Sequence, residues 1–453
     1  MPQSNAVGFD GSGGFGGSFY AAYKHTYGPS RVKPLVYRNR PFLRDARKKD
    51  DFTGDSYMHS IFFEDPDTGS VSISNALAQG NVSSQSARFA IWRGHEYQTL
   101  NLSAEEVRAA RDDAGSLLRK KDYETRRVID RMAYRIDIAM HNGGSGVLAS
   151  FTTGNAASLT ANPGVVTLDT NAMCVRFAVG MKLQGSTTAP IDGTPAALMN
   201  AGAVATVTAI NRSSVPGIPS TITLDQSLTT WLGAPATTSQ YFLLRAGDGV
   251  GFGQNVLTGG TCGLKCWLPA PPPIGTAFTT RLAANDSFWG FNRNVDPQRL
   301  AGCTYQAQPG EKYQVTFQNA GQELYINGGG NEPGKMKLYV APADYNGYSQ
   351  ELGPQVRYAD TNQGGAGFRD LMVRTQAGDM TLTADPQLEP GLFYMLDTDT
   401  YYIKTLDEMP HMDEQDGLTG LRLSGADAQQ IRWRSWHQLI FDEPGRNLVG
   451  RCV

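Results

Sequence analysis

Residues 34–58, PLVYRNRPFLRDARKKDDFTGDSYM, precede a charge-rich segment of helical periodicity, and this succession constrains the fold most. Residues 31–58 alternate basic and apolar side chains, and Pro34 and Pro41 each favour extended backbone at the residue before them. The pattern predicts a long extended arm that leads into a rigid helix. Because the arm has no apolar neighbour in its own sequence to pack on, we expect its partner to be another subunit. The chain is therefore predicted to be a building block of an assembly.

The helix is predicted over residues 103–141. Ser103 and Glu106 have the spacing of a capping box, in which each side chain accepts a bond from the other residue's backbone. Apolar residues then recur at helical spacing, so Met132 and Ile136 are expected to be buried. At about 1.5 Å per residue the element would span roughly 55–60 Å. The glycine run after residue 142 is typical of a helix C-terminus, and Gly115 is the expected site of a kink.

Composition excludes several classes of protein. Of the 453 residues, 40% are hydrophobic and 18% charged, which indicates a soluble chain of two or three domains. The formal net charge of −3 argues against a protein that grips nucleic acid. We expect no membrane span, because no run of about eighteen apolar residues is present. The first twenty residues do not resemble a secretory signal. Five cysteines, an odd number, indicate free thiols in a reducing compartment.

Two further segments near the N-terminus are expected to need a partner. The Gly/Ser-rich residues 1–20 contain four aromatic residues that we expect to anchor the segment on a neighbouring subunit: Phe9, Phe15, Phe19 and Tyr20. Residues 59–100 predict a hairpin, with strands HSIFFED and ARFAIWRGHEYQTL joined by the turn PDTGS. Because two strands alone are marginal in water, the hairpin is also expected to seek support elsewhere.

Residues 151–247 are rich in Ala, Thr, Gly and Val and poor in charge. The short β-branched runs VVTLD, AVATVTAI and TITLD predict a small all-β barrel or sandwich inserted as a unit, with Ser150 and Gly247 close together. Residues 248–300 are irregular and rich in proline. Residues 310–453 predict strands at EKYQVTFQ, KMKLYVAP, FRDLMVRT, DMTLTA and GLFYMLDTDTYYIKTLDE, and a final strand pair broken by Pro444.

The stretch VYRNRPFLRDARKKDDFTGDSY, followed by RFAIWRGHEY, the long helix and HNGGSG, resembles the major capsid proteins of tailed bacteriophages, as do the closing strands. The resemblance covers about residues 30–150 and 310–453. It implies an α+β fold, the tailed-phage major capsid protein fold, with a small all-β insertion. The implied parts are an N-terminal arm (N-arm, 1–50), an E-loop hairpin (51–102), the spine helix region of the peripheral domain (103–150), the inserted β-barrel or sandwich (151–247), and the axial domain with the remainder of the peripheral domain (248–453).

The same resemblance implies a structural function. Copies would form hexamers and pentamers of an icosahedral phage head, which encloses double-stranded DNA without sequence-specific binding. The implied location is the virion, after assembly in the bacterial host cytoplasm. The implied partners are further copies of the chain, a separate scaffolding protein, a portal and a decoration protein. The arm and hairpin residues expected at contacts between subunits are Phe9, Phe15, Phe19, Tyr20, Arg38, Arg40, Arg44, Phe62 and Phe63.

Catalytic and metal chemistry find little support. The six histidines, His141 among them, form no metal-ligand pair by spacing and are expected to be surface or packing residues. Cys262 and Cys266 lack a second pair. Asp397 and Asp399 are expected on one face of a strand, where a carboxylate pair could cleave sugars, but nothing else indicates a sugar cleft. We therefore expect no enzyme, cofactor or metal. The alternative functions are a β-rich carbohydrate- or surface-binding module of a virion and a soluble hydrolase.

Overall fold

The computed structural model describes most of the chain as two compact units. Unit 1 comprises Met1–Arg38, Glu96–Ile136 and Asp407–Ser435, and unit 2 comprises Asn39–His95, Asp137–Leu406 and Trp436–Val453. The described residues are 40–54, 56–65, 69–78, 84–103, 105, 120–142, 146–155, 158–187, 197–213, 219–233, 235, 239–248, 260–275, 281–282, 286, 288–328, 336–352, 371–407, 409–412, 421–422 and 427–452.

Unit 1 contains parts of one long helix and of a six-stranded sheet that β1 (Arg47–Lys49) and β16 (Tyr401–Thr405) of unit 2 complete. The elements are β4 (Gly94–Ser103), α5 (Lys120–His141), β17 (His411–Met412), β18 (Leu421–Arg422) and β19 (Ala428–Phe441), and the unit boundary falls inside β4, α5 and β19. β19 pairs with β4, β17 and β18, and Gln430 donates to the Asn101 side chain at 3.0 Å. The buried positions predicted for the helix are confirmed, because Met132 and Ile136 are almost fully buried. Ser103 ends β4, whereas Glu106 and Gly115 lie outside the described residues, so the cap stays a prediction.

The start of unit 2 differs from the extended arm that its sequence predicts. Residues 40–49 form α2 (Pro41–Asp45) and β1 (Arg47–Lys49), and β1 runs parallel to β16 (Tyr401–Thr405). The extended prediction is wrong for α2, because the fixed φ of Pro41 also suits the first position of a helix. On either side of the helix the backbone is non-helical, with φ −132° and ψ 76° at Arg40 and φ −66° and ψ 127° at Ala46. Phe42 is fully buried against the rings of His141 and Tyr401, so α2 is anchored on unit 2.

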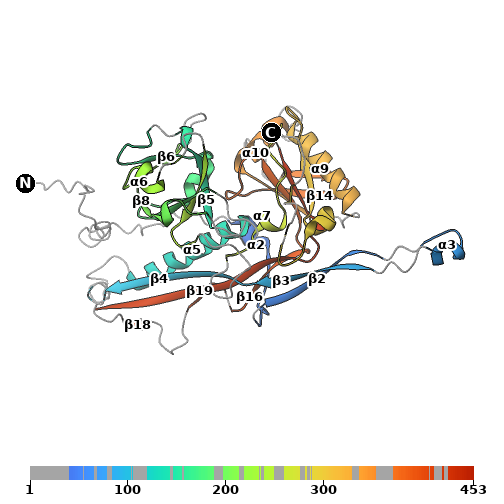
Figure 1. Ribbon diagram of the computed structural model, residues 1–453, viewed down its shortest axis with the longest axis horizontal. Helices are drawn as coiled ribbons and strands as arrows, with labels where there is room; N and C mark the ends of the chain where they lie inside the picture. Colours follow the sequence, from blue (N-terminus) through green and yellow to red (C-terminus); the bar gives the residue numbers. More distant parts are fainter. Residues whose placement is uncertain are drawn as a thin grey trace, which may run out of the picture. The chain divides into compact units, whose positions relative to one another are not determined.

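The predicted hairpin is present, with a helix that the sequence did not predict. Its elements are β2 (Ser56–Glu64), α3 (Ile73–Ala78) and β3 (Gln85–Trp92). β2 and β3 pair antiparallel, with Ile61 opposite Ala87, and Figure 1 shows them as a two-stranded ribbon. The predicted return strand is interrupted at Arg93, after which β4 pairs with β19 instead.

The low-charge middle of the chain forms a six-stranded sheet in the order β5-β10-β7-β8-β9-β6 (Figure 1). Its elements are β5 (Val147–Thr152), β6 (Val165–Thr167), β7 (Lys182–Ser186), β8 (Ala205–Asn211), β9 (Thr221–Leu224), β10 (Gln240–Arg245), α6 (Leu228–Leu232) and the 3-10 helices η1 (Thr153–Asn155), η2 (Asn171–Arg176) and η3 (Asn200–Gly202). The three β-branched runs are strands, as predicted. The first and last strands pair directly, with Ser150 opposite Phe242, so the two ends of the segment meet. We call residues 147–245 the inserted sheet.

The C-terminal region of unit 2 builds another six-stranded sheet, in the order β11-β20-β15-β12-β14-β13. The elements of this region are α7 (Leu264–Trp267), η4 (Arg293–Val295), α8 (Pro297–Leu300), β11 (Cys303–Gln306), α9 (Tyr313–Asn327), β12 (Met336–Val340), α10 (Pro342–Leu352), β13 (Met372–Thr375), β14 (Gly378–Ala384), β15 (Leu392–Asp397), η6 (Pro444–Arg446) and β20 (Leu448–Arg451). α9 packs on β11, β13 and β20, and α10 packs on β14 (Figure 1).

Two strand predictions in this region are wrong. EKYQVTFQ falls largely in α9, because the apolar pattern continues at helical spacing through Phe317, Ala320 and Leu324, which are all buried. The final two strands do not pair with each other, since β19 lies in the sheet with β16 whereas β20 pairs with β11 and β15. The η6 turn at Pro444 thus carries the chain from one sheet to another.

Candidate functional site

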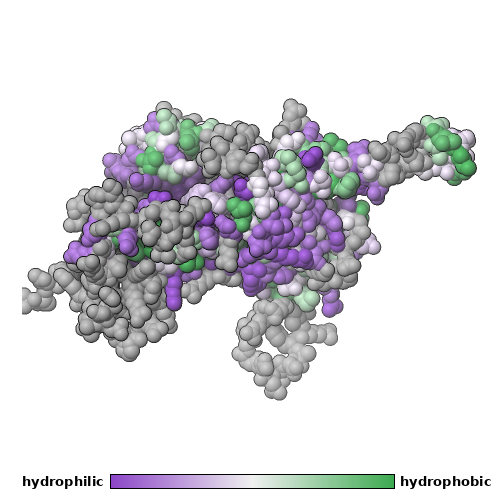
Figure 2. Space-filling view, turned by 90° about the horizontal axis from the view of Figure 1, so that it is seen from below, coloured by the Kyte–Doolittle hydropathy of each residue, from purple (hydrophilic) through white to green (hydrophobic). Residues whose placement is uncertain are grey.

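The most exposed apolar side chains of the described chain gather around α3. Val71, Ile73 and Leu77 are 105%, 81% and 78% exposed, and none of the six residues of α3 is buried. The helix forms locally, because the Ser72 hydroxyl accepts a bond from the backbone N–H of Asn75 at 3.3 Å and so caps its first turn. Figure 2 shows the apolar side chains of this segment gathered on the surface. We call residues 71–78 the hairpin tip.

Strand β2 of the hairpin has one buried face and one exposed face. One face of β2 buries His59, Ile61 and Phe63, and the ring of Phe63 contacts that of Phe291. On the other face Met58 and Phe62 are 51% and 74% exposed. One face of the hairpin thus finds the support that its two strands need, because it packs on aromatic residues of unit 2 that lie far away in the sequence. The other face is open.

An open hollow of about 660 Å³ lies beside β2. It is lined by Ser60, Ile61, Phe62, Phe63, Glu64, Asp65, Arg299, Asn327, Gly328, Asp442, Glu443, Gly445 and Arg446. Arg299 lines this hollow, and its guanidinium donates a hydrogen bond to the Phe63 carbonyl. The hollow is thus mixed in charge and continuous with the exposed Phe62, which suits contact with a protein surface better than binding of a small molecule.

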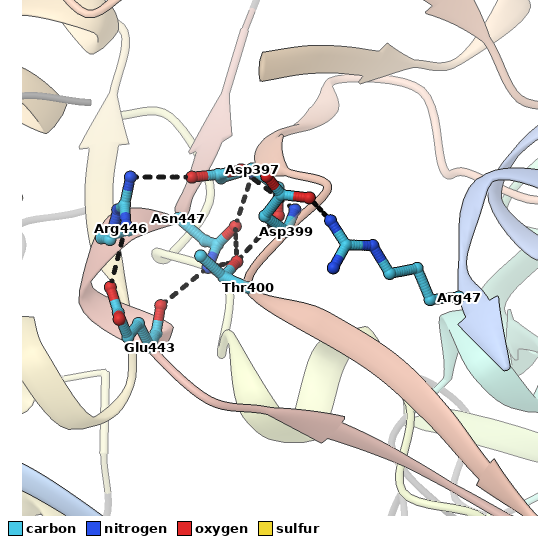
Figure 3. A network of polar contacts seen from close by, with 7 residues as sticks. All are labelled: Arg47, Asp397, Asp399, Thr400, Glu443, Arg446 and Asn447. Atoms are coloured by element: carbon cyan, nitrogen blue, oxygen red, sulfur yellow. Dashed lines mark hydrogen bonds and ion pairs between the residues drawn. The ribbon is translucent and has the colours of Figure 1, made fainter. Parts of the chain in front are cut away.

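A network of polar contacts fixes the turn between β15 and β16 (Figure 3). Asn447 holds both ends of the turn, since its Oδ1 accepts from the Asp397 N–H at 2.9 Å and its Nδ2 donates to Thr400 Oγ1 at 2.9 Å. Arg446 forms an ion pair with Asp397 at 3.1 Å, and Arg47 of β1 forms one with Asp399. The network therefore joins β1 to the turn.

The same geometry corrects the expectation that the two aspartates share a strand face. Asp399 lies in the turn, where its backbone N–H donates to Asp397 Oδ1 at 3.0 Å. Each carboxylate is also paired with an arginine. Paired carboxylates of this kind stabilise a turn and do not form the acid and nucleophile of a glycosidase.

A buried charge cluster lies where α5 ends. His141 Nε2 is 3.2 Å from Asp385 Oδ2, its Nδ1 donates to the Asp137 carbonyl at 2.8 Å, and all three side chains are buried. Burial alone lowers the pKa of His141, but the nearby Asp385 and Asp137 carboxylates raise it to about 9. Burial raises the pKa of Asp137 to about 6. His141 is therefore an ion-pair partner, and not the simple packing residue expected from sequence.

The structure describes only some of the residues predicted at subunit contacts. Arg40 precedes α2, Arg44 is exposed and pairs with Asp45 at 3.1 Å, Phe62 is exposed and Phe63 is buried. Phe9, Phe15, Phe19, Tyr20 and Arg38 lie outside the described residues. Sequence reasoning missed the hairpin tip, although the run VSISNALA carried a signal: a capping serine followed by apolar residues.

No group of three or more His, Cys, Asp or Glu side chains in the described ranges could hold a metal ion. The five cysteines are buried and free, as the odd count predicts. Among the described helices none is long and apolar enough to cross a membrane.

Known protein structures show which fold this geometry belongs to. No protein-family model matches the sequence, and no curated protein matches it. A chain of the cyanophage A-1(L) capsid asymmetric unit is similar in structure, with a TM-score of 0.51 and 9% identity over 93% of this chain and 94% of that one. A capsid chain of an empty GTA particle gives a TM-score of 0.47 with 9% identity, over 99% of each chain. The fold assignment rests on the first: the chain has the α+β fold of a tailed-phage capsid protein, as the resemblance implies.

Proposed function

We propose that the chain is the major capsid protein of a tailed phage and that its copies assemble into hexamers and pentamers of an icosahedral head around double-stranded DNA. The observation that carries the proposal is the hairpin tip, whose helix α3 has no buried residue and exposes Ile73 and Leu77, in a chain with a capsid-protein fold. Exposed apolar clusters mark interaction sites, and burying them between copies supplies the free energy of association. In this role the protein acts mechanically and not as an enzyme.

The remaining partners follow from the same proposal. The tip and the open face of β2, with Phe62, contact a neighbouring copy, as do Arg40 and Arg44 and the aromatic residues of the first twenty positions. A separate scaffolding protein, a portal and a decoration protein complete the head. A net charge of −3 fits a container that does not hold its DNA tightly. Assembly takes place in the bacterial host cytoplasm, and the mature protein lies in the virion.

The test is a double substitution in the hairpin tip. Ile73→Asp with Leu77→Asp places two charges on the apolar side of α3, where no residue of the same helix is buried. We expect a folded, soluble subunit, because exposed positions contribute little to the fold. We also expect at least a tenfold loss of closed particles when the variant is produced with its genomic neighbours and counted by electron microscopy.

The matched control is Ser74→Asp with Asn75→Asp, which adds the same charge at two exposed polar positions of the same helix. This control should assemble like the native chain. Normal particle yield from the Ile73 and Leu77 variant would contradict the role of the tip. Absence of particles from the native chain under all conditions would contradict the capsid function itself.

A further inference from the structure

Arg176, at the end of η2, joins the inserted sheet to the loop that follows β14. Its guanidinium is almost fully buried and donates three hydrogen bonds. Nη1 donates to the carbonyl of Leu148 on β5 at 3.0 Å, while Nε and Nη2 donate to the side chain and carbonyl of Gln387 at 3.2 and 2.6 Å. One side chain thus connects the first strand of the inserted sheet to Gln387.

Asp385 connects the same loop to two further elements. Its Oδ1 accepts from the Gln387 N–H at 2.9 Å, and its Oδ2 is 3.2 Å from His141 Nε2 at the end of α5. The backbone N–H of Phe42 on α2 also donates to this carboxylate. Asp385 is fully buried, so α2, α5 and, through Gln387 and Arg176, the inserted sheet are held at one point.

Asp137 is the member of this junction whose ionised form is least favoured. It is fully buried one helical turn before His141, and its Oδ1 is 3.9 Å from the His141 Nδ1. Neither oxygen of its carboxylate accepts a hydrogen bond from a described residue. An ionised carboxylate loses its hydration on burial, and without hydrogen bonds nothing replaces it, so the neutral form is favoured there.

We propose that this junction is a proton-controlled joint: proton uptake by Asp137 tightens the attachment of the inserted sheet to α5 and α2, and proton loss loosens it. The proposal does not depend on the capsid function. It assigns a regulatory role to a buried cluster that assembly surfaces leave unused.

The charged groups around Asp137 come from every element at the junction. α5 contributes His141, the loop after β14 contributes Asp385, η2 contributes Arg176, and the residue before α2 contributes Arg40. Glu389, in the same loop as Asp385, interacts with Arg176. Lys265 of α7 neutralises Glu389 at 2.5 Å. His141, Arg40 and Arg176 favour ionised Asp137, but burial and Asp385 outweigh them and raise the pKa of Asp137 to about 6 from 3.8.

The sign of the pH effect follows. Between the pKa of about 6 in the closed joint and 3.8 in the opened joint, the closed form binds the extra proton, so acidification through this window stabilises closure. Lowering the pH from about 6.0 to about 4.5 should slow opening about tenfold. His141, with a pKa of about 9, stays protonated in the closed joint throughout this window and adds little.

Hydrogen exchange of the full-length native chain, read by mass spectrometry, tests the proposal. Peptides that cover β5 and η2 are compared at pH 6.0 and 4.5, each normalised to the urea-unfolded chain at the same pH. We expect the native chain to exchange about tenfold more slowly at pH 4.5. In Asp137→Asn the pH response should fall below twofold, because the side chain no longer titrates.

Asp130→Asn is the matched control, since it removes a carboxylate from the same helix at a half-buried position and should keep the tenfold response. Should Asp137→Asn fail to fold, Asp137→Ser replaces it as a smaller neutral side chain. A native chain whose exchange is unchanged or faster at pH 4.5 would overturn the proposal. A tenfold response that persists without the Asp137 carboxylate would overturn it equally.

Discussion

The inserted sheet and the β2–β3 hairpin are both β-structures of unit 2, and they meet the need for burial in opposite ways. The inserted sheet encloses a cluster of eighteen buried residues drawn from its own segment, Phe151, Leu183 and Trp231 among them. The hairpin buries one face against distant parts of unit 2 and leaves Met58 and Phe62 exposed on the other. A segment with its own core can fold wherever it is inserted. A segment with an open apolar face is completed by another surface.

The local sequence explains the difference. The strands of the inserted sheet are short, low in charge and linked by turns, so six of them close over one core. The hairpin strands are longer, and from Met58 and Ala87 onward they alternate between buried and less buried positions. A period of two gives two distinct faces, and two strands cannot cover both. The contrast predicts that stability depends on the inserted sheet's core and assembly on the hairpin.

The largest effect is expected at Trp231, the fully buried indole at the centre of the inserted sheet, whose Nε1 donates to the Ala203 carbonyl at 3.0 Å. Trp231→Ala should destabilise the chain by about 3–5 kcal/mol, because it leaves a large cavity and an unpaired carbonyl. Urea unfolding followed by circular dichroism measures the loss. A change under about 1 kcal/mol would show that the inserted sheet does not depend on this core.

The second effect is a loss of stability at alkaline pH, and it arises at His141, where the inserted sheet is attached to α5. The pKa of His141 is raised from 6.5 to about 9 by Asp385 and Asp137 against the effect of burial. Protonated His141 therefore stabilises the fold fully near pH 6.5, and this contribution is lost as the pH rises through about 9. The loss amounts to roughly 3 kcal/mol, from about 1.4 kcal/mol per pKa unit.

Urea unfolding of the native chain at pH 7 and pH 10 measures this loss. His141→Gln is the matched variant, because its amide keeps hydrogen-bonding groups but does not titrate near these values. It should be less stable than the native chain at pH 7 and show little further loss at pH 10. Equal pH responses of the two chains would assign the alkaline loss to other groups.

The sequence predicted the inserted sheet well because the information is local. Each run of β-branched residues became a strand, and the meeting of the two ends follows from the pairing of β5 with β10. α9 was mistaken for a strand, since the first eight residues of its segment satisfy both periods and only the continuation to Leu324 distinguishes them. Pro41 was ambiguous for the same reason, as it suits extended chain and helix start alike.

The candidate sites were harder to predict because they depend on distant contacts. Asp385 lies 244 positions from His141, and no pattern in either neighbourhood indicates the pair. The spacing of Asp137 and His141, one turn apart on a helix, was visible but does not reveal that both are buried. Phe62 and Phe63 are both expected at subunit contacts from the sequence; the period of two in β2 places them on opposite faces, and which face meets Phe291 is fixed only by tertiary packing.

A smaller effect is expected at the N-cap of α6 in the inserted sheet. The hydroxyl of Ser227 accepts a hydrogen bond from the Thr230 N–H at 3.2 Å. Ser227→Ala should cost about 1 kcal/mol, through loss of one bond to an otherwise unpaired helix donor. Chemical denaturation detects a change of this size. Thr229→Ala, which leaves that bond in place, is the comparison, and an equal loss in both variants would refute the capping role.

The sharpest test of the comparison comes from two adjacent residues on opposite faces of β2, and the smallest effect on stability is expected at Phe62. Phe63 is 7% exposed and Phe62 is 74% exposed. Phe63→Ala should cost about 3–5 kcal/mol because it opens a cavity beside Phe291. Phe62→Ala should change the free energy of unfolding by less than about 0.5 kcal/mol, since its ring already contacts water. If the open face binds a neighbouring copy, Phe62→Ala should nevertheless lower the yield of closed particles, counted by electron microscopy. A variant that unfolds like the native chain and assembles like it would show that this face needs no partner.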